Sequence, residues 1–364
     1  MIADPDLARL VPWGWDAALA TAFAPHAEHG ALPGRVVVEE SSSCLVMTSA
    51  GERLTRLAGR FRHEHADDPL AYPGVGDWVV IEGQAEGLPI IERLPRRTAI
   101  IRRPPAHRGG NAQLLAANVD VLFIVASMNR DFNLRRLERY VVVAWESRAE
   151  PVILLSKADL VADVASYVGA ARSVAPGMSV IPVSAITGAG LHAIRGRLGQ
   201  GRTAAFVGSS GVGKSTLVNA LAGRELMATA ATREDDARGR HTTSRRQLLQ
   251  LADGLVLDTP GLRELGLADS EGLEAAFTDI AAIAERCRFR DCAHEREPGC
   301  AVRSAITSGE LPAARLASYE RLEREARAAQ RRTDAAARLT EQRRWKAIAK
   351  SNRARSKALD RGWA

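Results

Sequence analysis

The chain has 364 residues, a length that suits two or three domains better than one small core. The composition is that of a globular protein, with 46% hydrophobic and 26% charged residues, and no apolar run is long enough to cross a bilayer. The first residues contain no basic segment followed by an apolar one, so we expect no secretory signal. We therefore expect a monomeric cytoplasmic protein that does not associate with membranes.

The net charge of +7 is concentrated near the C-terminal end. Residues 321–364 contain 14 Lys or Arg and only 5 Asp or Glu, so the rest of the chain is slightly negative. A basic segment of this kind binds polyanions such as RNA by releasing counterions, but a solvated Arg-rich helix has the same composition. Trp345 and Trp363 lie among these cations and suit stacking on bases.

In chain order, residues 1–32 predict a short helical lead in which Trp13 and Trp15 pack. Residues 33–103 contain several short β-branched or alternating runs separated by Gly, Pro and Asp, which predict a small closed barrel of the OB or SH3 type. Such a barrel either contacts RNA or serves only for packing, and this one has few aromatic residues for stacking on bases. The Pro- and Gly-rich residues 103–111 predict a linker.

After the linker, apolar strands alternate with amphipathic helices. This pattern is typical of a parallel sheet covered by helices on both faces, and it defines a domain at residues 112–270. A helical domain follows at residues 271–320, and residues 321–364 continue as a basic helix, with no Pro or Gly between Ala313 and Arg361. The predicted fold class is α/β, with an OB-like barrel before the sheet and a helical domain after it.

The segment Gly208–Ser215 matches the phosphate-binding motif G-x-x-x-x-G-K-[ST], and it lies between an apolar strand and a helix. Its glycines let backbone N–H groups surround the β-phosphate at a helix N-terminus, where the helix dipole favours an anion. Lys214 is expected to neutralise the β- and γ-phosphates, and the Ser215 hydroxyl to bind Mg²⁺. The residues expected to contact phosphate are Gly208, Ser209, Ser210, Gly211, Val212, Gly213, Lys214, Ser215 and Thr216.

Residues 156–159 close a predicted strand and read Ser-Lys-Ala-Asp, which resembles the guanine-reading motif N-K-x-D. Asp159 is expected to accept hydrogen bonds from guanine N1 and the exocyclic amine, which adenine cannot offer. The Lys157 stem covers the base, and Ala158 completes the motif. Ser156 stands where the motif has Asn, so we expect a weaker base contact and a weaker tether between this loop and the P-loop.

Two other short motifs follow predicted strands. Ser184 and Ala185 come after the next strand, where a backbone N–H usually meets guanine O6. Asp258-Thr-Pro-Gly261 matches D-x-x-G: Asp258 is expected to hold Mg²⁺ through water, and the Gly261 N–H to face the γ-phosphate. Because parallel sheets bind ligands at the carboxyl ends of their strands, the coincidence of these motifs favours guanine over adenine.

The motifs occur in an unusual order. The base-reading motifs precede the P-loop and D-x-x-G follows it, whereas in ordinary small GTPases the base-reading motifs come last. In this order and in its flanking domains, nearly the whole chain resembles the RsgA (YjeQ) family of circularly permuted GTPases. Gly239-Arg-His-Thr-Thr243 is similar to the switch I sequence of that family, which implies that Thr242 or Thr243 binds Mg²⁺ and senses the γ-phosphate.

The resemblance implies a GTPase, alternating between GTP and GDP, that binds the small (30S) ribosomal subunit and its rRNA and couples hydrolysis to late assembly. Many GTPases have a Gln just after D-x-x-G that orients the attacking water, and here that position is Leu262. We therefore expect slow intrinsic hydrolysis, and the resemblance implies that the small subunit accelerates it. His241 either positions the water or contacts phosphate or RNA.

Three of the four cysteines lie within fourteen residues, together with a histidine. This cluster suits a structural tetrahedral Zn²⁺ site, because three thiolates and one imidazole leave no position for water. The spacing differs from common zinc fingers and equals the one found in the family that the chain resembles. The expected ligands are Cys287, Cys292, His294 and Cys300, whereas Cys44 is expected in the barrel core.

Two other functions stay open on the sequence alone. In the first, the chain is a GTP-regulated adaptor of a protein partner, and neither the tail nor the metal domain binds RNA. In the second, it is an RNA-processing NTPase that acts away from the ribosome.

Overall fold

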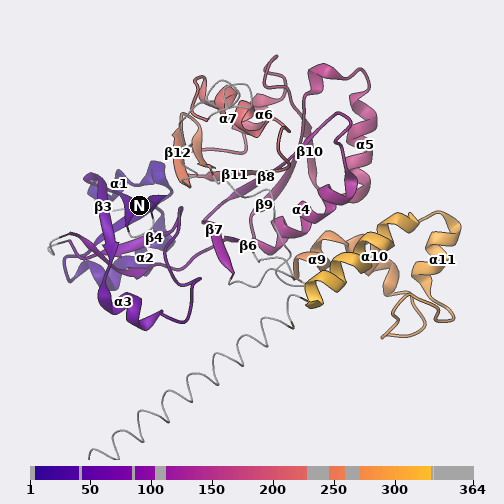
Figure 1. Ribbon diagram of the computed structural model, residues 1–364, viewed down its shortest axis with the longest axis horizontal. Helices are drawn as coiled ribbons and strands as arrows, with labels where there is room; N and C mark the ends of the chain where they lie inside the picture. Colours follow the sequence, from indigo (N-terminus) through magenta and orange to yellow (C-terminus); the bar gives the residue numbers. More distant parts are fainter. Residues whose placement is uncertain are drawn as a thin grey trace, which may run out of the picture.

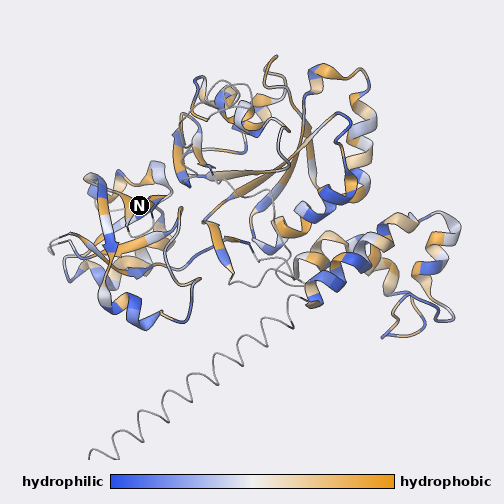
Figure 2. Cartoon of the chain, viewed as in Figure 1, coloured by the Kyte–Doolittle hydropathy of each residue, from blue (hydrophilic) through white to orange (hydrophobic). Residues whose placement is uncertain are grey.

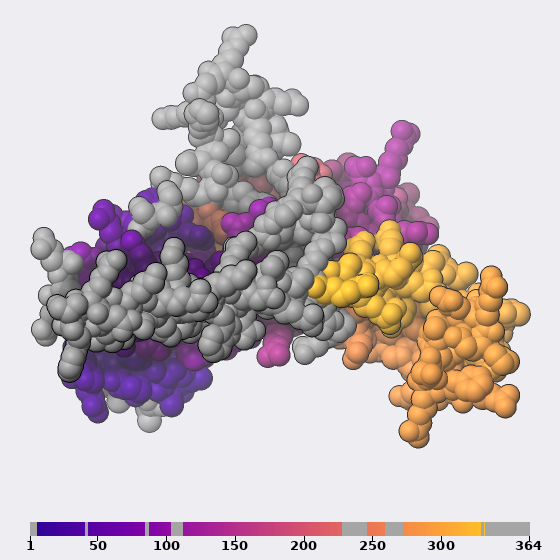
Figure 3. All heavy atoms as spheres, turned by 60° about the horizontal axis from the view of Figure 1, so that its bottom comes forward, coloured from indigo at the N-terminus to yellow at the C-terminus, as the bar shows by residue number. Residues whose placement is uncertain are grey.

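The computed structural model describes residues 5–40, 43–83, 87–102, 112–227, 246–258, 271–328 and 331. These residues form an N-terminal barrel, a central α/β domain and a C-terminal helical domain, and the barrel and the helical domain lie on opposite sides of the molecule (Figures 1 and 3). Across those ranges, none of the helices combines the length and the hydropathy that a membrane span requires.

A helical lead packs against one end of the barrel. It consists of α1 (Pro5–Ala8), the short 3₁₀ helix η1 (Val11–Trp13) and α2 (Ala17–Ala27). The Asp16 carboxylate caps α2 by accepting a hydrogen bond from the Leu19 N–H at 3.0 Å, as expected for an N-cap residue. Trp15 and Phe23 are buried against Trp78 of the barrel, so the lead extends the barrel core.

The barrel is closed and has the connectivity of an OB fold, because its strands pair in the order β1-β2-β3-β5-β4-β1 with a helix between β3 and β4. This confirms the OB-like prediction. β2 and β3 form a hairpin in which Thr48 pairs with Gly51, and Gly51 follows the turn with a φ of +95°. The barrel elements are β1 (Leu32–Glu39), β2 (Cys44–Thr48), β3 (Gly51–Leu57), α3 (Gly59–Glu64), β4 (Trp78–Ile81) and β5 (Pro89–Arg93).

A two-stranded ribbon, β6 (Ala99–Arg102) and β7 (Gln113–Ala117), connects the barrel to the central domain. The predicted linker at residues 103–111 comes between these two strands in the sequence and lies outside the described residues. The barrel also joins the central sheet directly, since Val38 of β1 pairs with Gln247 of β12 (Gln247–Leu251).

The central sheet has the order β10-β9-β8-β11-β13-β12, and all neighbours are parallel except β12. Its strands are mainly apolar (Figure 2), as expected for a sheet covered on both faces. One face packs against α4 and α5, and the other against α6 and α7. The remaining elements of this domain are β8 (Val121–Ser127), α4 (Leu134–Glu146), β9 (Glu150–Ser156), η2 (Ala158–Leu160), α5 (Val164–Val174), β10 (Ser179–Pro182), α6 (Leu191–Arg195), β11 (Thr203–Val207), α7 (Lys214–Ala222) and β13 (Gly254–Asp258).

The C-terminal domain contains α9 (Glu271–Ala276), α10 (Thr278–Ala284), α11 (Ala301–Ser308) and a further helix at residues 313–328. It packs against α4 closely enough that a Cβ at Gly272 would lie 2.5 Å from the Val142 carbonyl oxygen. Its apolar side chains, including Phe277, belong to the same core as the α4 face of the sheet. The helical domain is thus continuous with the central domain.

Candidate functional site

The motifs meet at one edge of the central sheet. Ser156 ends β9, Gly208 follows β11 and Asp258 ends β13, and these strands are parallel within one sheet. Ser184 lies two residues beyond the end of β10. The carboxyl ends of all four strands therefore lie at the same edge, so the motifs come together although their chain order is permuted.

The P-loop runs from β11 into α7 with left-handed backbone at three glycines. The φ angles are +150° at Gly208, +76° at Gly211 and +95° at Gly213. A Cβ at Gly208 would lie 2.3 Å from the Val125 carbonyl oxygen, so this position excludes every other residue. These conformations curve the loop toward the first turn of α7, where unpaired N–H groups and the helix dipole attract phosphate.

The Lys214 side chain turns back across the P-loop. Its Nζ donates hydrogen bonds to the carbonyl oxygens of Gly208, at 2.8 Å, and of Ser209, at 2.7 Å. The ammonium group is therefore held against the backbone of the loop by two uncharged acceptors, and phosphate oxygens can replace them by offering a full negative charge.

Ser156 ties the base-reading loop to the P-loop. Its buried hydroxyl donates a hydrogen bond of 2.6 Å to the Val212 carbonyl oxygen. The shorter side chain thus makes the tether that we expected to be weakened by the loss of Asn. The sequence could not reveal this contact, because it depends on how closely β9 and the P-loop approach.

The two base-reading loops are joined by their backbones. The Ala158 N–H donates to the Val183 carbonyl oxygen at 3.1 Å, and the Ser184 hydroxyl accepts the backbone N–H groups of Ile186 and Thr187. Lys157 has a φ of +62°, which turns the chain so that Asp159 stands exposed in η2. The carboxylate is consequently open to a ligand at this edge.

The cysteine cluster of the C-terminal domain has the geometry of a metal site. The four ligand atoms of Cys287, Cys292, His294 and Cys300 all lie within 4.8 Å of one another. The His294 Nδ1 atom lies 3.8 Å from the Cys287 Sγ and 3.5 Å from the Cys300 Sγ. A tetrahedral zinc with ordinary bond lengths separates sulfur and nitrogen ligands by about 3.6 Å, so these residues fit Zn²⁺.

Comparisons with known proteins agree with this geometry. A family model described as RsgA GTPase matches residues 93–268. The chain is also 45% identical over 299 residues to the "Small ribosomal subunit biogenesis GTPase RsgA 2" of Lactiplantibacillus plantarum, covering 82% of this chain and 84% of that protein. The chain belongs to the RsgA GTPase family.

Two crystal structures resemble the RsgA-type fold described above. YjeQ from Thermotoga maritima superposes with a TM-score of 0.61 at 27% identity, covering 81% of this chain and 98% of that one. YloQ, whose title calls it a circularly permuted GTPase, gives 0.58 at 26% identity and covers 83% and 97%. Membership of the RsgA family confirms a P-loop enzyme that hydrolyses GTP, and it implies a guanine nucleotide with Mg²⁺.

One neighbour of the P-loop in this RsgA-family chain was not expected from the sequence. Arg136 in the first turn of α4 donates a hydrogen bond from Nη1 to the Ser209 hydroxyl at 2.5 Å. Tyr140, one turn later, also hydrogen-bonds Ser209, while burial raises the pKa of this phenol. Their i, i+4 spacing would place both on one helix face, but nothing in the sequence shows that this face meets the P-loop.

The switch residues of this family member lie outside the described residues. These switch residues are His241, Thr242, Thr243 and Gly261. The tail residues beyond 331 also lie outside the described residues. Asp258, which is expected to hold Mg²⁺, does lie within the described residues. It is half-buried at the end of β13. Cys44 is buried, and burial raises the pKa of its thiol to about 12, which suits the predicted core role.

Proposed function

We propose that this protein binds the small ribosomal subunit and couples GTP hydrolysis to a late step of subunit maturation. The observation that carries the proposal is the 45% identity to a small ribosomal subunit biogenesis GTPase over 84% of that protein's length. The nucleotide site at the sheet edge and the Cys₃His cluster supply the parts that such a function requires.

We assign the roles at the nucleotide edge as follows. The P-loop N–H groups hold the β-phosphate, Lys214 leaves its carbonyl partners to bind the β- and γ-phosphates, and Ser215 binds Mg²⁺. Asp159 reads guanine, with Ala185 meeting its O6. The remaining expected contacts are Ser156, Lys157, Ala158, Ser184, Ser209, Ser210, Val212 and Thr216 around the nucleotide, and Asp258 and Gly261 at the metal and γ-phosphate.

Hydrolysis in this proposal is slow until the ribosomal partner completes the site. Leu262 cannot orient water, so His241 or a group from the subunit takes that role. A group supplied in trans raises turnover by about 10³–10⁵ in other GTPases. Thr242 or Thr243 links the γ-phosphate to switch I.

Two regions offer contacts to rRNA. In the barrel, exposed cations lie on β3 and α3, and they are Arg53, Arg56, Arg60 and Arg62. At the other end of the chain, residues 321–364 carry the excess of positive charge. The barrel and the helical domain lie on opposite sides of the central domain (Figure 1). A change at the nucleotide edge can therefore alter the relative placement of these two RNA-binding regions.

In the C-terminal domain, one Zn²⁺ with a structural role would be held by Cys287, Cys292, His294 and Cys300. The bound ion would fix the loop between α10 and α11, which has no other regular structure.

A GTPase assay with and without purified small subunits tests the proposal. We expect the subunits to raise turnover by at least about tenfold, and the Lys214→Ala variant to show no stimulated turnover. Unchanged turnover on adding subunits would remove the ribosome from this account. Stabilisation by ADP instead of GDP in a thermal-shift assay would favour the RNA-processing NTPase.

A further inference from the structure

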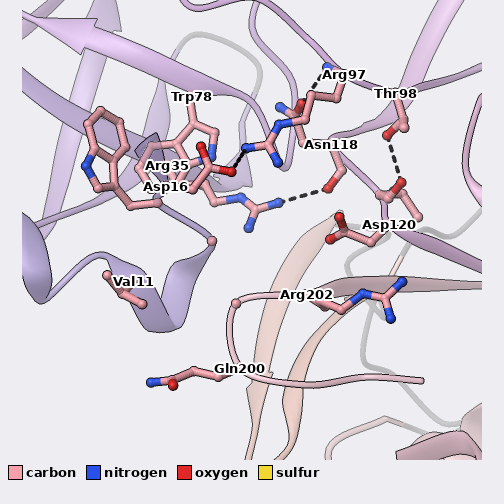
Figure 4. Close-up of a pocket in the computed structure, with 14 residues that line it drawn as sticks. Val11, Asp16, Arg35, Trp78, Arg97, Thr98, Asn118, Asp120, Gln200 and Arg202 are labelled. Carbon is pink, nitrogen blue, oxygen red and sulfur yellow. Dashed lines mark hydrogen bonds and ion pairs between the residues drawn. The ribbon is translucent and has the colours of Figure 1, made fainter. Parts of the chain in front are cut away.

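One strand of the barrel, β1, contacts the central domain at both edges of the central sheet. At the amino edge, the buried Arg35 donates hydrogen bonds to the Trp13 carbonyl oxygen of the lead and to the Thr203 hydroxyl at the start of β11 (Figure 4). Glu39, at the end of the same strand, pairs with Arg246, the residue just before β12. This second contact lies at the nucleotide edge, because β12 runs antiparallel to β13 and begins where β13 ends.

At this second contact, Arg246 joins three parts of the chain. Its Nη1 atom lies 3.4 Å from a Glu39 carboxylate oxygen of the barrel, and it donates a hydrogen bond of 2.8 Å to the Leu114 carbonyl oxygen of the β6–β7 ribbon. The Arg246 side chain is 14% exposed and that of Glu39 is 37% exposed. Burial raises the pKa of the Glu39 carboxyl, and the Arg246 charge opposes part of that rise. The guanidinium therefore compensates the carboxylate at a site that is only partly open to solvent.

Beside this ion pair, a line of backbone pairs runs from the barrel to Asp258. Val38 of β1 pairs with Gln247, and Gln247 pairs with Asp258 at the end of β13. The register of β13 with its other neighbour, β11, ends at Leu257, one residue before Asp258. The position of Asp258 in the sheet is therefore set from the β12 side, and the ion pair next to Gln247 fastens β12 to the barrel at this point.

The ion pair is expected to matter more for the nucleotide site than for folding. A pair whose carboxylate is partly exposed adds little to stability, because solvent screens the two charges. The placement of reacting and metal-binding groups is far more sensitive, since a displacement of about 1 Å can lower turnover by about 100-fold. A contact that fixes the strand next to Asp258 can therefore affect GTP hydrolysis while the protein stays folded.

We propose that Glu39 and Arg246 are positioning residues for GTP hydrolysis, which hold the start of β12 so that the Asp258 carboxylate is placed for magnesium. Neither residue touches the nucleotide in this role. The role rests on the assignment of Asp258 to magnesium under the proposed function, and it is independent of the ribosomal partner. It makes the barrel strand β1 a support of the nucleotide edge.

Binding of a fluorescent, non-hydrolysable GTP analogue, measured with magnesium and in magnesium-free buffer, tests this role. Magnesium should tighten binding to the parent protein, and Asp258→Asn should lose this gain. In Arg246→Gln and in Glu39→Gln, we expect the gain to fall by about 2- to 30-fold and GTP turnover to fall with it, whereas the affinity in magnesium-free buffer stays unchanged. Arg246→Lys keeps a cation beside Glu39 and should retain most of the gain.

Two further variants sharpen the test. Arg97→Gln removes the ion pair of Arg97 with Asp16, 2.6 Å long, at the opposite edge of the sheet (Figure 4), and it should keep the magnesium gain of the parent. The double variant of Glu39 and Arg246 should lose no more than either single variant, because the two side chains act as one pair. A purely structural role would instead lower the melting temperature and weaken analogue binding equally with and without magnesium, which would contradict the proposal.

The proposal is overturned if Asp258→Asn loses the gain while Arg246→Gln and Glu39→Gln keep it. If Asp258→Asn also keeps the gain, the assignment of Asp258 to magnesium is wrong and the positioning role falls with it. Turnover that small subunits do not stimulate would contradict only the ribosomal function. If Arg246→Gln does not fold, Glu39→Gln decides alone, because its side chain is the more exposed of the two.

Discussion

At position 156 a hydroxyl replaces the usual carboxamide, and the structure places it on the Val212 carbonyl oxygen at 2.6 Å. In Ser156→Ala this buried oxygen loses its donor, which costs about 1–3 kcal/mol. We therefore expect the dissociation constant for GDP to rise by roughly 5- to 150-fold, with a smaller change in Ser156→Asn. Titration with a fluorescent GDP analogue measures both.

Ser173→Ala is the matched control for this prediction. Its hydroxyl also donates to a backbone carbonyl, that of Ala170, but on an exposed helix face away from the site. Equal GDP affinities for Ser156→Ala and Ser173→Ala would show that the tether does not support nucleotide binding.

The helix α4 contacts both the nucleotide edge and the C-terminal domain. Arg136 in its first turn meets Ser209 of the P-loop, whereas Glu138 lies buried on the C-terminal side. There Glu138 accepts hydrogen bonds from Arg315, at 2.9 Å, and from the Ser318 hydroxyl. One rigid element thus connects the P-loop to the helix at residues 313–328, and this offers a route by which nucleotide state reaches the C-terminal domain.

Removing the central cation of this network should destabilise the fold. In Arg315→Met, Glu138 is left as a buried, unpaired carboxylate, and Asp279 also loses its partner. We expect the free energy of unfolding to fall by about 3–5 kcal/mol in chemical denaturation. Arg327→Met removes an exposed i, i+4 partner of Glu323. This control should change the free energy of unfolding by no more than about 0.5 kcal/mol. Similar losses in both variants would contradict a buried network.

Metal removal tests the loop between α10 and α11. Without the ion, the three thiols and His294 no longer hold this loop, and we expect a strong chelator to lower the melting temperature and to open residues 285–300 to proteolysis. Cys292→Ser should reproduce both effects and make the protein insensitive to the chelator. A chelator that changes neither property in the parent protein would exclude a structural ion.

The sequence predicted those elements whose patterns are local. Apolar runs predicted the parallel strands, and the glycines at 208, 211 and 213 predicted a phosphate-binding loop, in which the structure has left-handed backbone at all three. The helix α3 and the β6–β7 ribbon were not predicted, because they have short or mixed patterns. Arg35, Arg136 and Arg315 were also missed, since their partners lie 22 to 177 residues away and the side chain alone indicates a solvated cation.

At the scale of the whole molecule, the excess of positive charge lies at the C-terminal end of the chain, whereas the barrel has exposed arginines but no excess of positive charge. The barrel carries exposed arginines on β3 and α3, and residues 329–364 alone hold 11 Lys or Arg against 3 Asp or Glu. Polyanion binding by such segments depends on salt, because each phosphate contact releases counterions. The salt dependence of subunit binding therefore reports how many contacts each end makes.

Deleting residues 329–364 should reduce that dependence without unfolding the protein, because the buried contacts of Arg315 and Ser318 precede the deletion. Each lost phosphate contact lowers the slope of log affinity against log salt by about 0.7–0.9. We expect weaker small-subunit binding with a shallower slope between about 50 and 200 mM salt, measured by sedimentation with subunits, and unchanged GDP affinity. In the same assay, a full-length variant with Arg60 and Arg62 changed to Gln tests whether the barrel makes phosphate contacts.

If binding is independent of salt in the parent chain, the partner is recognised as protein instead of rRNA, which is the behaviour expected of the adaptor.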